Sequence, residues 1–280
     1  MANTKEVKRR IRLVKTTSQI TRAMELVAAT KMRKAESDAK GTRPYSDHAR
    51  KILRSLVGRA EKKDSPFLRT NEKGKILALV ITPDRGLCGS LSANVLRETN
   101  ALLSKFPKEE IDVMTIGKRG ADVLRRQGYN IIAAATRLDW KPRVFDVRTF
   151  AKIALDGYET EKYKKVYLIF SNFISSSSQK PIMTTLLPFT SAGKQESDYL
   201  YLIEPSPEVV LPVVVRNLVE MEIFQALLES NASEHSARML AMHSATENAK
   251  DLMDDLSLSY NRIRQESITR ELAEISASAA

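Results

Sequence analysis

The chain has 280 residues, of which 42% are hydrophobic, and a formal net charge of +11. That length and apolar content can bury a core in one or two domains, which excludes a wholly disordered polar chain. A single cysteine excludes an internal disulfide framework and favours a reducing compartment, and no apolar run approaches the roughly 20 residues that span a bilayer.

A long helix is expected at the N-terminal end, because residues 1–40 contain neither glycine nor proline. Such a helix is about 55 to 60 Å long. Its apolar residues form two neighbouring stripes, and the contact stripe is therefore expected to drift around the helix. The stripes consist of Val7, Ile11 and Val14, and of Leu13, Ile20, Met24 and Val27. Gly41 and Pro44 are expected to interrupt this helix, a second helical stretch to follow from Tyr45 to Arg59, and a polar linker to contain Gly58, Pro66 and Gly74.

The whole basic excess belongs to this N-terminal segment. Residues 1–63 contain 18 Lys/Arg and 6 Asp/Glu, a net of +12, whereas the other 217 residues contain 27 and 28, a net of −1. Such a field attracts nucleic acid, anionic lipid or an acidic protein surface, although a solvated helix face explains it equally well. Tyr45 is the only aromatic residue there, so the stacking platforms of single-strand binders are missing.

Between residues 75 and 206, short apolar strands alternate with helices. Strands are expected at 75–82, 111–117 and 130–136, and helices at 93–106, 118–127 and 146–158. This alternation predicts an α/β module with a mainly parallel sheet. The segments before and after Ser175–Ser178 are expected to form a hairpin with an antiparallel second strand, and 198–205 to add a further strand.

The last 68 residues, Val213 to Ala280, contain no glycine and no proline, which predicts a helix of about 100 Å. Its apolar positions alternate steps of three and four, as in a coiled coil. They are Met239, Met242, Thr246, Ala249, Met253, Leu256, Tyr260 and Ile263. The two terminal helices flank the α/β module and can pair antiparallel. The C-terminal helix is longer by 28 residues, so its end is expected to project by about 40 Å.

Two loops at strand ends resemble phosphate-binding turns without matching either glycine-rich motif. Asp84–Ser90 and Gly117–Gly120 each precede an expected helix, but a tight strand-to-helix turn explains both better. Cys88 at a helix start is more simply a buried neutral thiol than a nucleophile. His235 and His243 are eight residues apart, too far along one helix to bind one ion. The sequence therefore predicts no catalytic, cofactor-binding or metal-binding residues.

Four stretches, in order, resemble the gamma subunit of F-type ATP synthase, the central rotor shaft. They are IRLVKTTSQITRAMELVAATKMRKA (11–35), ITPDRGLCGSLSANV (81–95), SEHSARMLAMHSATENA (233–249) and NRIRQESITRELAEI (261–275). The resemblance covers essentially the full length. It implies an α/β fold with a long antiparallel coiled coil formed by the terminal helices and an inserted Rossmann-like domain. The implied domains are 1–60, 74–206 and 207–280. The start of the chain, without a transit peptide, suggests a bacterial-type member.

The resemblance also implies partners for particular residues. The contacts it implies with the alpha/beta hexamer are Met24, Arg238, Arg264, Gln265, Ile268, Thr269, Leu272 and Ile275, the three apolar tip residues sitting in a bearing. The residues on the shaft towards the c-ring and epsilon subunit are Lys31, Arg33, Lys34, Glu204 and Pro205. It implies a subunit that is not itself an enzyme, without cofactor or nucleic acid, peripheral to the cell membrane on its cytoplasmic side. An α/β enzyme with helical oligomerisation arms and a nucleic-acid-binding coiled coil stay open as alternatives.

Overall fold

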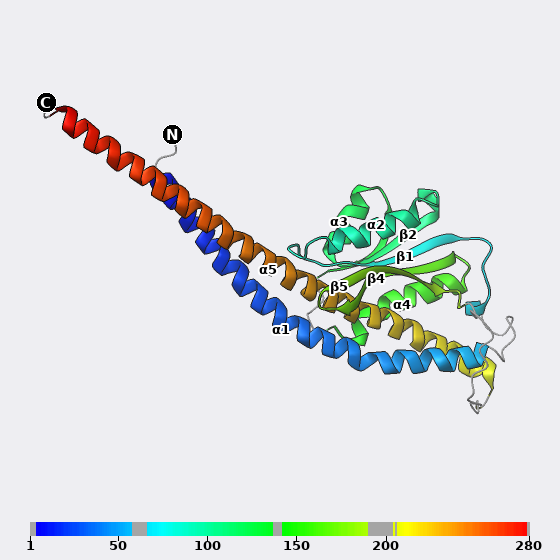
Figure 1. Ribbon diagram of the computed structural model, residues 1–280. Helices are drawn as coiled ribbons and strands as arrows, with labels where there is room; N and C mark the ends of the chain where they lie inside the picture. Colours follow the sequence, from blue (N-terminus) through cyan, green and yellow to red (C-terminus); the bar gives the residue numbers. More distant parts are fainter. Residues whose placement is uncertain (1–3, 58–65, 137–141, 190–203, 205, 279–280) are drawn as a thin grey trace. The chain divides into compact units, whose positions relative to one another are not determined.

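A computed structural model describes residues 4–57, 66–136, 142–189, 204 and 206–278. Packing divides the chain into two compact units: residues 1–29 with 238–280, here the coiled-coil unit, and residues 30–237, here the sheet unit. Two long helices, α1 (Thr4–Val57) and α5 (Pro207–Ser278), contribute to both units (Figure 1). The domain boundaries expected from the sequence kept each helix whole, whereas packing divides both helices.

The sheet unit contains a five-stranded sheet in the order β3-β2-β1-β4-β5. Its strands are β1 (Lys75–Ile81), β2 (Ile111–Ile116), β3 (Asn130–Ala135), β4 (Tyr163–Ser175) and β5 (Ser178–Leu187). The first four are parallel, and β5 pairs antiparallel with β4. The parallel sheet and the antiparallel hairpin expected from the sequence are both confirmed.

Helices cover both faces of this sheet (Figure 1). On one face α2 (Leu91–Leu103) and α3 (Lys118–Arg126) pack on alternate residues of the central strand, such as Ile76 and Val80. On the other face α4 (Val144–Glu159) and the first part of α5 pack on Leu77 and Leu79. Residues Ile76–Ile81 are at most 2% exposed, because a parallel strand between two helical layers has no face towards water.

The expected polar linker is partly wrong. Residues 58–65 lie outside the described residues, but Pro66–Leu68 forms a 3-10 turn in which Phe67 and Leu68 are buried in the sheet core. The amide of Phe189 donates to the carbonyl of Phe67 at 3.0 Å, which ties this turn to the segment after β5. The two hydrophobic side chains of this segment therefore pack into the core, although the residues around them are polar. The further strand expected at 198–205 lies outside the described residues except for Glu204.

The interruption of the first helix at Gly41 and Pro44 is also wrong, because α1 is continuous through both residues. A proline inside a helix removes one N–H donor, here the donor to the carbonyl of Lys40, four residues earlier. Here the side chain of Gln225 in α5 donates to the carbonyl of Ala39 at 3.1 Å. The neighbouring helix α5 thus contacts the turn of α1 that sequence reasoning treated as a break.

In the coiled-coil unit the predicted seam of α5 is confirmed. All eight seam positions from Met239 to Ile263 are buried or half-buried, whereas Leu252 and Leu258 between them are 47% and 70% exposed. On α1 the facing positions are Val7, Ile11, Val14, Ser18 and Thr21, followed by Ala28. Steps of three and four on both helices are the spacing of a two-stranded coiled coil.

The prediction that the contact stripe moves onto the second set of apolar residues is therefore wrong. Leu13, Ile20 and Val27 are 61%, 56% and 55% exposed, and of that second stripe only Met24 is half-buried. The contact side instead continues through Ser18 and Thr21, and the Thr21 hydroxyl contacts Thr246 across the seam and the backbone carbonyl of Ser18. An apolar pattern cannot detect contact positions occupied by polar side chains.

Candidate partner-binding surfaces

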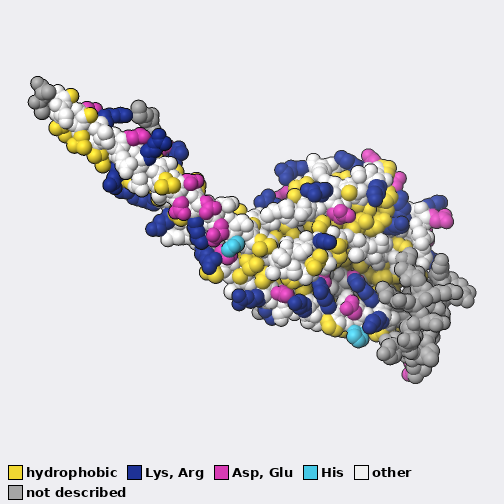
Figure 2. All heavy atoms as spheres, viewed as in Figure 1, with side chains coloured by type: hydrophobic (Ala, Val, Ile, Leu, Met, Phe, Trp, Pro, Cys, Tyr) yellow, Lys and Arg dark blue, Asp and Glu magenta, His cyan; other side chains and the backbone are white. Residues whose placement is uncertain are grey.

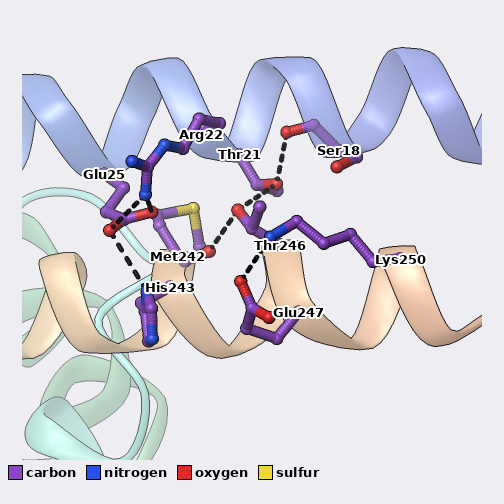
Figure 3. A network of polar contacts seen from close by, with 9 residues as sticks. All are labelled: Ser18, Thr21, Arg22, Glu25, Met242, His243, Thr246, Glu247 and Lys250. Atoms are coloured by element: carbon purple, nitrogen blue, oxygen red, sulfur yellow. Dashed lines mark hydrogen bonds and ion pairs between the residues drawn. The ribbon is translucent and has the colours of Figure 1, made fainter.

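A polar layer lies in the seam of the coiled-coil unit (Figure 3). The Thr21 and Thr246 hydroxyl oxygens are 2.8 Å apart, and Thr246 is 2% exposed. Thr246 also contacts the carbonyl of Met242 at 2.8 Å, and Thr21 contacts that of Ser18 at 3.1 Å. Because a slipped pairing would leave a buried hydroxyl without this contact, the layer favours one register of α1 against α5.

One turn further along, a charged group crosses the same helix pair. Glu25 of α1 accepts from Nη1 of Arg22 at 3.0 Å, and Nδ1 of His243 in α5 lies 3.2 Å from its Oε1. On α5, next to Thr246, Lys250 donates to Glu247 at 2.8 Å and lowers the pKa of that carboxyl (Figure 3). The pairs Thr21–Thr246 and Glu25–His243 advance in opposite directions along the two helices, which establishes the antiparallel pairing.

This pairing determines where α5 loses its partner. From Thr21 to Thr4 is 17 residues, and the same step from Thr246 reaches Ile263. Ile263 is indeed the last half-buried residue of α5, and every residue from Arg264 to Ser278 is exposed. The unpaired end has 15 residues, or about 22 Å, instead of the 28 residues and 40 Å expected. The expectation was too long because it ended the first helix at residue 40.

The exposed end of α5, here the tip, contains most of the residues that the resemblance assigned to the hexamer. Ile268, Leu272 and Ile275 are 45%, 60% and 64% exposed and lie on one helix face, because they are spaced by four and three. Hydrophobic side chains are visible together at this end in Figure 2. Arg264, Gln265 and Thr269 are also exposed on the tip, whereas Met24 and Arg238 are half-buried lower in the coiled-coil unit.

The residues assigned to the c-ring and epsilon side belong to the sheet unit. Lys31 is half-buried, Arg33 is exposed, and Lys34 donates to Asp38 at 2.9 Å on its own helix. Glu204 is exposed, and Pro205 lies outside the described residues. The two sets of assigned residues therefore fall in different units.

The loops at the carboxyl ends of β1 and β2 are turns that close the fold, as expected. Gly117 has φ 102°, and a Cβ there would lie 1.7 Å from the carbonyl oxygen of Thr82. The hydroxyl of Thr82 accepts from the amide of Gly120 at 2.8 Å, and Asp84 accepts from the amide of Lys118 at 2.8 Å. Cys88 is 3% exposed. These groups join strand to helix, so the glycines are explained by close backbone approach.

Neither a metal site nor a membrane-spanning helix is found among the described residues. No group of three or more His, Cys, Asp or Glu side chains there could hold a metal ion. No described helix combines the length and hydropathy needed to cross a membrane.

Comparison with known proteins identifies the family. A family model described as ATP synthase matches residues 3–280. The ATP synthase gamma chain of Chloroflexus aurantiacus is 44% identical, with 100% of this chain and 99% of the relative aligned. The chain belongs to the ATP synthase gamma chain family. The gamma chain of Coxiella burnetii, at 38% identity over 100% of this chain and 99% of its own length, is a second bacterial relative.

Solved structures agree with this gamma-chain fold. The rotor of Euglena gracilis mitochondrial ATP synthase matches with a TM-score of 0.70 at 19% identity, over 95% of this chain and 98% of that chain. A chain of the central stalk and c-ring of Tetrahymena thermophila mitochondrial ATP synthase matches with a TM-score of 0.64 at 25% identity, over 81% and 99%. The resemblance read from four sequence stretches is thus confirmed.

Sequence reasoning missed Ser18, Thr21 and Glu25 as contact residues of the gamma-chain coiled coil. A usable signal existed, because Val7, Ile11 and Val14 continue in steps of four and three to Ser18 and Thr21. No comparable spacing pattern in the sequence indicates that Glu25 contacts His243. The sequence analysis considered His243 only as a possible metal ligand.

Proposed function

We propose that this gamma chain is the non-catalytic central shaft of an F-type ATP synthase, turning with a c-ring and changing the conformation of surrounding alpha and beta subunits. The observation that carries this proposal is the 15-residue tip of α5, which extends beyond the paired part of the coiled coil. An exposed apolar face on an isolated helix end requires another surface to cover it. The solved relatives called rotor and central stalk support that assignment.

The coiled-coil unit is the part that meets the alpha/beta hexamer. The tip face of Ile268, Leu272 and Ile275 forms an apolar bearing, and Arg264, Gln265 and Thr269 contact loops around it. Met24 and Arg238 contribute lower down. Leu13 and Ile20, which point away from α5, extend this contact surface along α1. The sheet unit, with Lys31, Arg33, Lys34 and Glu204, faces the c-ring and epsilon subunit, and Pro205 is assigned there by motif alone.

Asymmetry of the coiled-coil unit explains how rotation can change nucleotide affinity. Residues 4–29 of α1 contain seven Lys/Arg and two Asp/Glu, whereas residues 247–255 of α5 contain four Asp/Glu and one Lys. Each catalytic subunit around the shaft therefore faces a different charge at each angle. A surface that binds one subunit conformation better than another shifts that subunit's equilibrium by the difference in affinity. Charge contacts of this kind also guide assembly.

We infer that the chain itself is not catalytic from the packing at the carboxyl edge of the sheet, where a doubly wound fold would bind a ligand. There Thr82, Gly117 and Gly120 contact one another at backbone distance. We assign the chain to the cytoplasmic side of the cell membrane, attached through its partners. Protease digestion of inverted and right-side-out vesicles tests this side, because only inverted vesicles should lose the chain.

The central experiment measures capture of the purified chain by an alpha/beta hexamer. We expect one chain per hexamer and no ATP turnover by the chain alone. Replacing Ile268, Leu272 and Ile275 together by glutamine should weaken capture by about tenfold or more, because three apolar side chains lose their burial. The matched control replaces Ser267, Glu271 and Glu274 by glutamine on another face of the same tip and should change capture little. Equal capture by both triple variants, or turnover by the chain alone, would contradict the proposal.

A further inference from the structure

The buried side of α5 changes character within the sheet unit. As far as Leu228 its buried residues belong mainly to the apolar core, as Leu218, Ile223 and Leu227 do. Beyond that point most of them are polar: Glu229, Ser230, Ser233 and Ser236 are 7%, 8%, 0% and 0% exposed, with Ala232 also buried between them, and Gln225 just before them is 7% exposed. A buried polar side chain costs free energy unless it is hydrogen-bonded, so the partners of this row decide what it does.

The first part of the row joins three elements at one guanidinium. Arg43 of α1 donates from Nε to Glu229 at 3.1 Å and from Nη2 to the carbonyl of Phe173 in β4 at 3.1 Å. Gln225 donates to Glu229 at 3.0 Å and to the carbonyl of Ala39 at 3.1 Å, and it accepts from the hydroxyl of Thr42. We call these side chains the junction network: Thr42, Arg43, Gln225 and Glu229.

The second part of the row holds α5 along the β4–β5 hairpin. Ser233 donates to the carbonyl of Ser171 at 3.1 Å, while Ser230 accepts from the amide of that residue at 3.4 Å. Ser236 donates to the carbonyl of Ser176 and accepts from Nε2 of Gln179 at 3.2 Å. Three serines spaced by three residues thus contact the hairpin from its strand to its turn.

Directional bonds resist a motion that apolar packing tolerates. An apolar helix face can shift against its neighbour and regain much of its buried area, whereas a hydrogen bond is lost when its atoms move apart. The guanidinium fork of Arg43 is especially restrictive, because its two donors point to groups on two different elements. Losing one net hydrogen bond multiplies the population of a slipped arrangement by roughly fivefold to tenfold.

We propose that the junction network is a register lock: Arg43, Gln225 and Glu229 are positioning residues that stop α1 and α5 from slipping against the β4–β5 hairpin under load. This inference rests on the proposed function, since only a chain that transmits force needs such a lock. The lock acts within the sheet unit, where force received by the sheet must reach the two helices. Its loss lets ATP hydrolysis continue while less of the rotation is converted into ion transport.

The test uses the complete ATP synthase in inverted membrane vesicles, with ATP hydrolysis and ATP-driven ion uptake measured on the same sample. The main variant is Arg43→Met with Glu229→Met, which keeps the volume filled and leaves no buried charge unpaired. Such replacements often preserve stability. We expect normal incorporation, near-normal hydrolysis and a ratio of ion uptake to hydrolysis lowered by about threefold or more. Gln225→Met should lower the ratio less.

The matched control is Arg148→Met with Glu220→Met, which removes another ion pair on α5, at 3.5 Å, outside the junction network. Its ratio should equal that of the parent. A parent-like ratio in the Arg43/Glu229 variant overturns the lock, and so does failure of both junction variants to incorporate, because the network is then needed for folding alone. The proposed function fails separately if vesicles lacking this chain still take up ions on ATP addition.

Discussion

The sheet unit and the coiled-coil unit bury their residues to very different depths. In the sheet unit the central strand and its covering helices contain many side chains at 0% exposure, such as Leu79, Met114 and Tyr163. In the coiled-coil unit most seam residues are only half-buried, and small or polar residues such as Ala28 and Thr246 occupy the deepest positions. Two helices alone cannot enclose a core. The first unit is therefore built to be stable by itself, and the second to be completed by its partners.

The largest effect expected from this difference comes from truncating the sheet core. Leu79→Ala removes a fully buried side chain from β1 and should cost about 3 kcal/mol of unfolding free energy, because the transfer and cavity terms add. Hydrogen exchange of the purified chain measures it, with faster exchange expected in β1, β2 and β4. Leu13→Ala, which truncates a side chain 61% exposed, is the control and should cost less than about 0.5 kcal/mol. Equal losses of unfolding free energy in Leu79→Ala and Leu13→Ala would contradict the proposed difference in burial between the two units.

A smaller effect is expected from the polar layer of the coiled coil. Thr246→Val keeps the shape but removes the hydroxyl that contacts Thr21, at an expected cost of about 1 kcal/mol. Exchange should accelerate in α5 from residue 238 to Ile263, with the sheet unit unchanged. Thr17→Val is the matched control, since the Thr17 hydroxyl donates only to Leu13 on its own helix and the residue is exposed. Protection unchanged in Thr246→Val would mean that the layer does not stabilise the register.

The two units also differ in how well the sequence predicted them. The mainly parallel sheet and the hairpin followed from period and alternation, because buried parallel strands such as 75–81 are continuous apolar runs. The contact positions of α5 were likewise predicted correctly from the sequence. The α1 seam was not, because Ser18 and Thr21 occupy contact positions that hydropathy assigns to solvent. The junction network could not be predicted either, since Arg43 in α1 is 186 residues from Glu229 in α5 and only the fold brings them together.

The site assignments depended on a different kind of information. Tip residues such as Ile268 and Leu272 could be recognised as an uncovered apolar face only once the pairing register showed where α1 ends. Motif resemblance supplied their expected partners in advance, but spacing alone did not. The pairing register seen in the structure therefore located the surface, and similarity to a family suggested what covers it.

The smallest expected effect is a loss of stability of the sheet unit at alkaline pH. Burial raises the pKa of Tyr163, and the neighbouring Asp112 carboxylate, which accepts from the Tyr163 hydroxyl at 3.1 Å, raises it further. Burial also raises the pKa of Tyr158 in the same unit. A tyrosine whose pKa is higher in the folded state stabilises the fold fully below its unfolded pKa of about 10 and loses that contribution as the pH rises. For Tyr163 the loss should be about 0.4 kcal/mol at pH 10 relative to pH 8.

Hydrogen exchange corrected for its intrinsic pH dependence should therefore show weakening of the sheet unit between pH 8 and pH 10.5. In Tyr163→Phe the unit starts less stable, because Asp112 loses a donor, but it should lose less with rising pH than the parent does. The slope, and not the absolute stability, is thus the diagnostic quantity. Asp112 keeps Asn130 as a donor at 2.8 Å and Lys75 at 3.4 Å, so the variant retains partners for its buried carboxylate. An unchanged slope would show that Tyr163 does not link this fold to alkaline pH.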